Sequence, residues 1–233
     1  MAAVHKKLRK QRKSREDGGA SQQQNRETAE WQAREAAQTG DAYSKLIAEG
    51  VWYASKEDRR KAAKAYREAI ALRPDEPVAY YNLGNALSNS GHHVEAAQRY
   101  LEAKDRFPVG SEEWAGATAQ AFNMLKLEEC DEAAKPEWWN DEGLKALSAR
   151  VVRAAPNEAT AHSMRADVLG GHCSDLWEVG HCSDLWEVGP RSAAELEEAA
   201  THFDRAAAMC DAPAAKAWHA SFAVAYRSRA EAM

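Results

Sequence analysis

Residues 77–108 read PVAYYNLGNALSNSGHHVEAAQRYLEAKDRFP, and this stretch fits the chain again when it is moved back by 34 residues. Self-similarity at a period of this length is the sequence signature of a solenoid built from helical hairpins. The stretch therefore predicts an all-α repeat fold. The matched pairs are Gly84 with Gly50, Ala96 with Ala62, Tyr100 with Tyr66, Ala103 with Ala69 and Pro108 with Pro74.

The repeated residues have physical roles in a helical hairpin. Gly84 permits a close approach of two helices, Gly91 allows the chain to turn between them, and Pro108 ends the second helix. Alanine and tyrosine recur at helical spacing in that second helix, so a small side chain admits the neighbouring helix and a ring fills the gap beside it.

The composition supports a helical, soluble, intracellular protein. The chain has 233 residues, of which 45% are hydrophobic, and alanine and charged residues dominate. We expect no membrane span and no secretory signal, because no apolar run is long enough. The expected compartment is the cytoplasm, with the nucleus as a second possibility. The cysteines are then expected to be thiols; they are Cys130, Cys173, Cys182 and Cys210.

Charge divides the chain into a basic tail and an acidic body. Residues 1–15 hold seven Lys or Arg and no acid, whereas the remaining 218 residues hold 24 basic and 36 acidic side chains. Residues 1–26 have too few apolar side chains to fold, so we predict a disordered basic tail. This tail could be only a solvated segment, or it could direct nuclear import or contact nucleic acid. The six basic residues of the candidate import or polyanion-binding cluster are Lys6, Lys7, Arg9, Lys10, Arg12 and Lys13.

The rest of the chain divides into a lead-in helix at 27–40 and a repeat array at 41–233. We predict repeats near 43–76, 77–110, 111–158 and 159–213, and a capping helix at 214–230. The third and fourth repeats are interrupted. The third has a break at 126–140 and no Ala-aromatic-Ala set, whereas the fourth keeps Ala199, Phe203 and Ala206 after a long loop. Asp41, Ser111 and Ser192 are expected to cap helices.

These residues resemble the tetratricopeptide repeat family, in which an aromatic residue, Leu-Gly and a second aromatic residue precede Ala, aromatic, Ala and Pro. The resemblance implies a right-handed helical-hairpin solenoid of about four hairpins, and non-catalytic protein binding as an adaptor or scaffold. The first repeat supplies Leu46, Gly50, Tyr53, Ala62, Tyr66, Ala69 and Pro74. The second supplies Tyr80, Leu83, Gly84, Leu87, Gly91, Ala96, Tyr100, Ala103 and Pro108.

The nonapeptide HCSDLWEVG occurs twice, at 172–180 and 181–189. The two His-Cys pairs could in principle bind zinc, but their spacing matches no established finger. We therefore favour a flexible loop with an exposed Leu-Trp contact patch. No glycine-rich phosphate loop, dinucleotide fingerprint, nucleophile elbow or zinc-helix motif is present. We expect no catalytic residue, no cofactor and no metal.

The most specific candidate site is the concave groove of the second repeat, which the family geometry places along its first helix. Asn82, Asn85 and Asn89 lie three and four residues apart, so they form one stripe. Because an Asn amide both donates and accepts, such a stripe can hold the backbone of an extended peptide. The six groove residues are Val78, Tyr81, Asn82, Asn85, Ser88 and Asn89.

This stripe is similar to the asparagine ladder of O-linked N-acetylglucosamine transferases, so the chain could be an isolated repeat region of such an enzyme. Alternatively, the stripe is a common repeat sequence without a binding role. Chaperone-tail binding is not expected, because only Asn82 matches the family's carboxylate-binding pattern. The other four corresponding positions are Ile47, Val51, Glu112 and Gly116. A nuclear or nucleic-acid-associated protein that binds through its tail remains the alternative from a different class.

Overall fold

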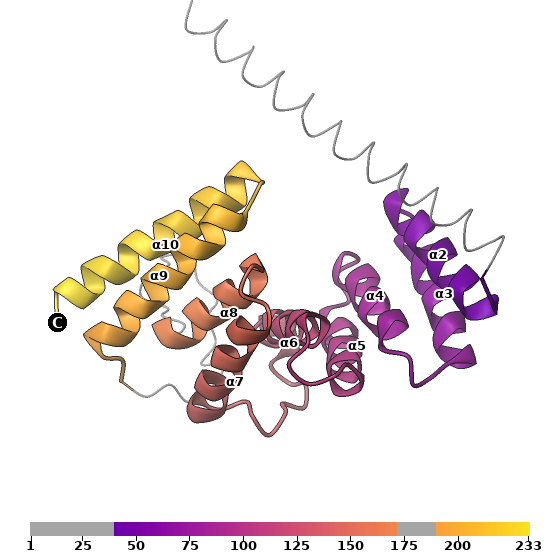
Figure 1. Ribbon diagram of the computed structural model, residues 1–233, viewed down its shortest axis with the longest axis horizontal. Coiled ribbons are helices and arrows are strands. Elements are labelled where there is room, and N and C mark those ends of the chain that lie inside the picture. Colours follow the sequence, from indigo (N-terminus) through magenta and orange to yellow (C-terminus); the bar gives the residue numbers. More distant parts are fainter. Residues whose placement is uncertain (1–39, 172–189) are drawn as a thin grey trace, which may run out of the picture. The chain divides into compact units, whose positions relative to one another are not determined.

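The computed structural model describes residues 40–171 and 190–233, and within these ranges every regular element is a helix. Consecutive helices up to Ser90 pack on one another, and so do consecutive helices from Gly91 onward, as in a helical-hairpin repeat, which confirms the predicted all-α class (Figure 1). The basic tail, nearly all of the lead-in helix and both nonapeptides lie outside the described residues. The helices are α2 (Ala42–Ser55), α3 (Arg59–Leu72), α4 (Pro77–Ser88), α5 (His93–Arg106), α6 (Glu112–Leu125), the 3-10 turn η1 (Glu128–Cys130), α7 (Asp141–Ala154), α8 (Ala159–Gly170), α9 (Ala193–Met209) and α10 (Pro213–Glu231).

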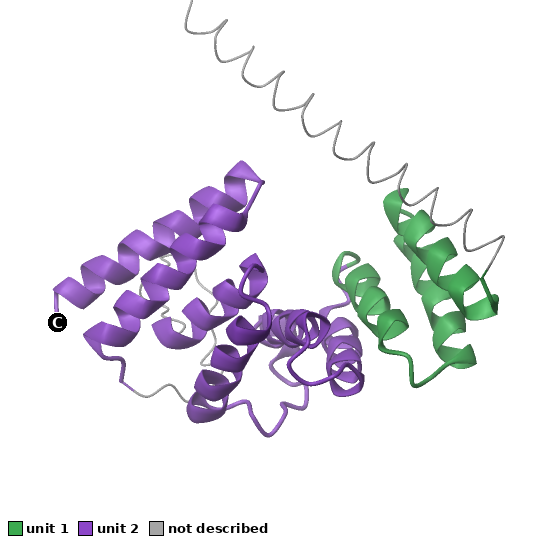
Figure 2. Ribbon diagram, in the orientation of Figure 1, with its two compact units in different colours: residues 1–90 green, residues 91–233 purple. Residues whose placement is uncertain are grey.

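The helices form two compact units, one ending at Ser90 and the other beginning at Gly91 (Figure 2). The division falls inside the second predicted repeat. The domain and repeat boundaries derived from the sequence stay a prediction.

The first unit contains α2, α3 and α4, with α3 packed on both of the others. Asp41 caps α2 by accepting a hydrogen bond from the Ser44 backbone N–H at 3.0 Å, as predicted. The alanines of the repeat pattern are fully buried on α3, and the Tyr66 ring between them is 3% exposed. This ring lies against Gly50 of α2, where a side chain would not fit. The small-plus-aromatic pattern therefore brings α2 and α3 together.

The turn between α2 and α3 is a Schellman motif. The Asp58 backbone N–H donates to Tyr53 O at 3.0 Å, and the Glu57 N–H donates to Ala54 O at 3.0 Å. Glu57 takes the left-handed conformation that this motif requires, with φ of 61°. Glycine is the usual residue at this position because it has no Cβ to clash.

The second unit contains α5 to α10. The Trp114 and Phe122 rings of α6 share a core with Leu144 and Val151 of α7 and with residues of α8. Leucine and valine thus replace the missing Ala-aromatic-Ala set on α7. A second core joins α8, α9 and α10 around Phe203, whose ring stacks on that of Tyr226.

The interruption at 126–140 folds back onto this unit. Trp138 and Trp139 pack against the α6–α7 core, and the centroids of the Trp139 and Phe122 rings are 5.6 Å apart. The Lys135 ammonium donates to Leu125 O at 2.8 Å and to Cys130 O at 2.7 Å. The predicted loop therefore contributes buried surface to the core.

Helix starts in the second unit follow the predicted signals. Ser111 accepts a hydrogen bond from the Trp114 backbone N–H at 3.1 Å. Ser192 and Glu195 form a capping box at the start of α9.

Candidate functional site

A pocket of about 330 Å³ opens in the first unit between α2, α3 and α4. It lies at the end of the unit where α2 ends, α3 begins and α4 ends. A volume of this size accommodates a short segment of a ligand rather than a large cofactor. Its lining residues are Val51, Ala54, Glu57, Arg59, Tyr66, Asn82, Asn85, Ala86 and Asn89.

The three asparagines predicted from the sequence all line this pocket. Asn82 and Asn85 are half-buried on α4, and Asn89 is exposed at the C-terminal end of that helix. The spacing of three and four residues therefore places the amides along one wall. The other groove residues, Val78, Tyr81 and Ser88, lie on the same helix but do not line the pocket.

Two charged residues that line the pocket, Glu57 and Arg59, are not among the site residues predicted from the sequence. They flank Asp58, the N-cap residue of α3. A signal for Glu57 was present in the repeat itself. Moved forward by 34 residues, its position becomes Gly91, which has φ of 77°. At this turn the first repeat thus has the charged residue Glu57, whereas the second repeat has glycine, which adopts a positive φ without strain.

The Arg59 side chain is exposed and forms no ion pair within the part of the chain that the structure describes. The nearest carboxylate in sequence is occupied, since Asp58 accepts from the Lys61 N–H at 3.2 Å and pairs with its ammonium at 2.8 Å. That hydrogen bond and ion pair hold the pKa of Asp58 below its usual value. Arg59 therefore keeps its donors available to a ligand.

The apolar floor of the pocket is formed by alanine and valine side chains with the Tyr66 ring. Burial raises the pKa of Tyr66 above its ordinary value, so the phenol stays neutral. The pocket therefore combines an apolar floor, three amides and one charge of each sign. This arrangement suits noncovalent recognition of a polar chain, whereas it contains no nucleophile with an adjacent base.

Replacing Glu57 by glycine is expected to stabilise the protein by about 1 kcal/mol, because glycine adopts a positive φ without steric cost. Thermal unfolding followed by circular dichroism measures this change. Glu49→Gly is the matched control, since Glu49 is an exposed residue inside α2 and its replacement should destabilise by about 1 kcal/mol. A destabilised Glu57→Gly variant would contradict the prediction.

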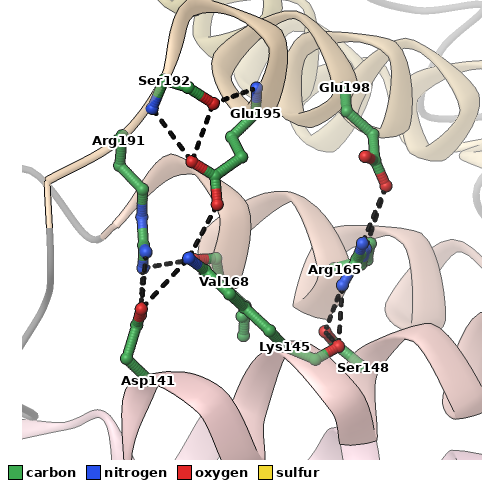
Figure 3. A network of polar contacts seen from close by, with 9 residues as sticks. All are labelled: Asp141, Lys145, Ser148, Arg165, Val168, Arg191, Ser192, Glu195 and Glu198. Carbon is green, nitrogen blue, oxygen red and sulfur yellow. Dashed lines mark hydrogen bonds and ion pairs between the residues drawn. The ribbon is translucent and has the colours of Figure 1, made fainter.

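A network of charged side chains joins α7, α8 and α9 in the second unit (Figure 3). The Arg191 guanidinium, which is 3% exposed, donates to both oxygens of Asp141 at 2.9 and 2.5 Å and to Val168 O at 2.9 Å. Lys145 pairs with Asp141 at 3.1 Å and with Glu195 at 2.7 Å. The network therefore attaches the start of α9 to α7 and α8.

These contacts shift the pKa values of the acids in the network. Hydrogen bonds from Lys145 and Ser192 lower the pKa of Glu195 to about 2, and the Arg191 guanidinium lowers the pKa of Asp141. Arg165 completes the set, donating to Glu198 at 2.9 Å and to Lys145 O at 2.8 Å. Because each charge is met by an opposite charge, we interpret the network as structural.

A buried histidine pair lies between α8 and α9. The Nδ1 atoms of His162 and His202 are 2.7 Å apart, and His162 Nε2 lies 2.9 Å from Pro156 O. A carbonyl oxygen only accepts, so His162 Nε2 carries the proton and its Nδ1 accepts from His202 Nδ1. His202 Nε2 is then unprotonated and carries a lone pair, and it lies 3.7 Å from Glu198 Oε1.

The structure assigns no metal cluster to the described ranges, where no group of three His, Cys, Asp or Glu side chains is suitably placed. Cys130 and Cys210 are free thiols, and burial raises the pKa of Cys130. The two His-Cys pairs and the Leu-Trp patches at 172–189 lie outside the described residues, as do the basic tail residues. No helix in the described part of the chain has the length and apolar character needed to cross a bilayer.

Comparisons with known proteins agree with the repeat pattern. The TPR repeat family matches residues 53–91. The chain is also similar to the cellulose synthase operon protein C of Pseudomonas fluorescens (strain SBW25), with 29% identity over 105 residues. That similarity covers 43% of this chain and 8% of the relative, so the chain spans a small part of that protein's length.

Proposed function

We propose that this chain, which matches the TPR repeat family over residues 53–91, is a non-catalytic adaptor that binds an extended peptide segment of a partner protein in the pocket of its first unit. Such repeats are typical of protein-interaction modules. The single observation that carries the proposal is the convergence of three predicted asparagines on one pocket.

The chemistry of the pocket supports a peptide main chain as the ligand. An extended peptide exposes alternating N–H and C=O groups, and an Asn amide can donate to one and accept from the other. Asn82 and Asn85 are half-buried, so their hydrogen bonds to a ligand would be partly shielded from water. The alanine and tyrosine floor would contact the side chains that point inward.

The test is an affinity selection with a pool of acetylated heptapeptide amides, randomised at every position. The immobilised full chain is incubated with the pool, and retained peptides are identified by mass spectrometry. We expect a defined subset to be retained. The double variant Asn82→Ala with Asn85→Ala should retain that subset about tenfold less, since each lost hydrogen bond contributes about 0.5–1.5 kcal/mol.

Two controls make this test decisive. Asn157→Ala removes an exposed asparagine in the loop between α7 and α8 and should leave retention unchanged. Circular dichroism verifies that the double variant is folded. Failure of the folded wild-type chain to retain any peptide, or equal retention by the double variant, would overturn the proposal. A salt-dependent RNA mobility shift that is lost on deleting residues 1–15 would favour the tail-binding alternative instead.

A further inference from the structure

The pocket residue Glu57 occupies a backbone position that disfavours it. Its φ of 61° lies in the left-handed region, where the corresponding residue of the next repeat is Gly91. A side chain in this region is disfavoured relative to glycine, because its Cβ crowds the neighbouring backbone. Glu57 nevertheless lines the pocket. An unfavourable residue at the wall of a pocket is an indication of function.

Arg59 places a charge of the opposite sign in the same pocket, two residues farther along the chain. Two other basic residues of the unit have acidic partners, since Lys61 pairs with Asp58 and Arg73 pairs with Asp41. Glu57 and Arg59 do not form an ion pair with each other in the described structure. Both charges are therefore presented to a ligand instead of neutralising one another.

We propose that the pocket selects a peptide segment carrying one acidic and one basic side chain, with Arg59 binding the acid and Glu57 binding the base. This inference rests on the proposed peptide-binding function and specifies the ligand class. The planar guanidinium of Arg59 can donate two parallel hydrogen bonds to a carboxylate. The carboxylate of Glu57 can accept from a lysine ammonium or an arginine guanidinium.

The paired charges also exclude other ligands. A segment with two acids would place one of them near Glu57, and a segment with two bases would place one near Arg59, so both are repelled. The asparagines do not discriminate by side-chain charge, because they contact the main chain. Specificity therefore depends on Glu57 and Arg59, whereas affinity depends on the asparagines.

The experiment uses four pools of acetylated heptapeptide amides with two fixed positions, two residues apart. On an extended chain such residues point to the same side. The fixed pairs are Asp with Lys, Asp with Gln, Asn with Lys, and Asn with Gln, each in both orders, and the other five positions are randomised among uncharged residues. Retention on the immobilised full chain is measured for each pool.

We expect the Asp-Lys pool to be retained about fivefold to tenfold more than the Asn-Gln pool. Each exposed ion pair contributes a factor of about two to five, and the single-charge pools should fall between. Raising the salt concentration from 0.05 to 0.5 M should reduce the preference, because exposed charges are screened.

Single variants assign the two charges to their residues. Arg59→Gln should remove the preference for Asp over Asn and keep that for Lys over Gln, whereas Glu57→Gln should do the reverse. Arg60→Gln and Glu49→Gln are matched controls, since both residues are exposed on α3 and α2 and neither lines the pocket. These controls should keep both preferences.

The outcomes separate the inference from the function on which it rests. Equal retention of all four pools by the wild-type chain, lost in the double asparagine variant, would overturn the charge selection and leave peptide binding intact. No retention of any pool would overturn both. A charge preference that survives both Arg59→Gln and Glu57→Gln would also overturn the inference, because the selecting residues would lie elsewhere.

Discussion

Gly50→Ala is expected to lower the free energy of unfolding by about 3 kcal/mol, near the upper end of overpacking substitutions. A Cβ at this position would lie 2.3 Å from Cε1 and 2.7 Å from Cζ of the Tyr66 ring. The ring is 3% exposed, so it has no free space into which it could move. The loss outweighs the gain of about 1 kcal/mol that alanine normally brings to a helix interior. Chemical denaturation followed by circular dichroism measures the change.

A second substitution determines whether the ring is the cause. In a Tyr66→Leu background the ring atoms that contact the Cβ are gone, so Gly50→Ala should become neutral or stabilising. Such a reversal of sign is the non-additivity expected of residues in direct contact. Gly91→Ala is the steric control, because its φ is 77° and nothing lies within 4 Å of the added atom. It should cost only about 1 kcal/mol. Additive effects of the Gly50 and Tyr66 substitutions would contradict the prediction.

The sequence predicted the helices of both units well, because its signals are local and physical. The 34-residue period, the capping residues at Asp41, Ser111 and Ser192, and the buried alanines each depend on a few neighbouring residues. The third repeat was harder to predict. On α7, leucine and valine fill the space that aromatic residues fill elsewhere, and the break at 126–140 contributes two tryptophans to the core. Contacts between distant residues of this kind have no periodic signature.

The candidate pocket was predictable in part. One wall follows from the asparagine spacing on α4, which is a local pattern. The opposite wall comes from the end of α2 and the start of α3, so it depends on how three helices pack. Comparison of the turn positions, Glu57 against Gly91, could have identified one of its charged residues. Arg59 carries no such signal, since exposed arginines are common on protein surfaces.

Acid should weaken the second unit through its buried histidine pair, and most of the effect should occur between pH 6.5 and 4. Burial, with the neighbouring His162, lowers the pKa of His202 to about 4 in the folded protein. The unfolded chain takes up a proton near pH 6.5, whereas the folded chain resists it until about pH 4. The stability present above pH 6.5 is therefore lost progressively as the pH falls. Over that interval the free energy of unfolding should decrease by about 3 kcal/mol.

Of the charged groups around His202, one raises its pKa and two lower it. Glu198 favours the protonated imidazole, whereas Arg165 and Arg205 oppose it. The pKa of His219 on α10 is also lowered by burial, so a smaller slope of the same sign should remain without His202. The pKa values of the Glu195 and Asp141 carboxylates are lowered in the folded protein. These two groups therefore reduce the stability only below about pH 4, where they become protonated and lose their ion pairs.

His202→Asn isolates the contribution of this histidine. An Asn amide can still donate a hydrogen bond to His162 Nδ1, but it does not titrate. The variant should therefore lose most of the pH dependence between 6.5 and 4, measured by urea unfolding at half-unit steps of pH. His92→Asn is the matched control, since His92 is exposed and its side chain forms no cap on α5. This substitution removes only the proton-binding site at His202. If the free energy of unfolding depends on pH as steeply in His202→Asn as in the wild type, the acid sensitivity arises from other groups.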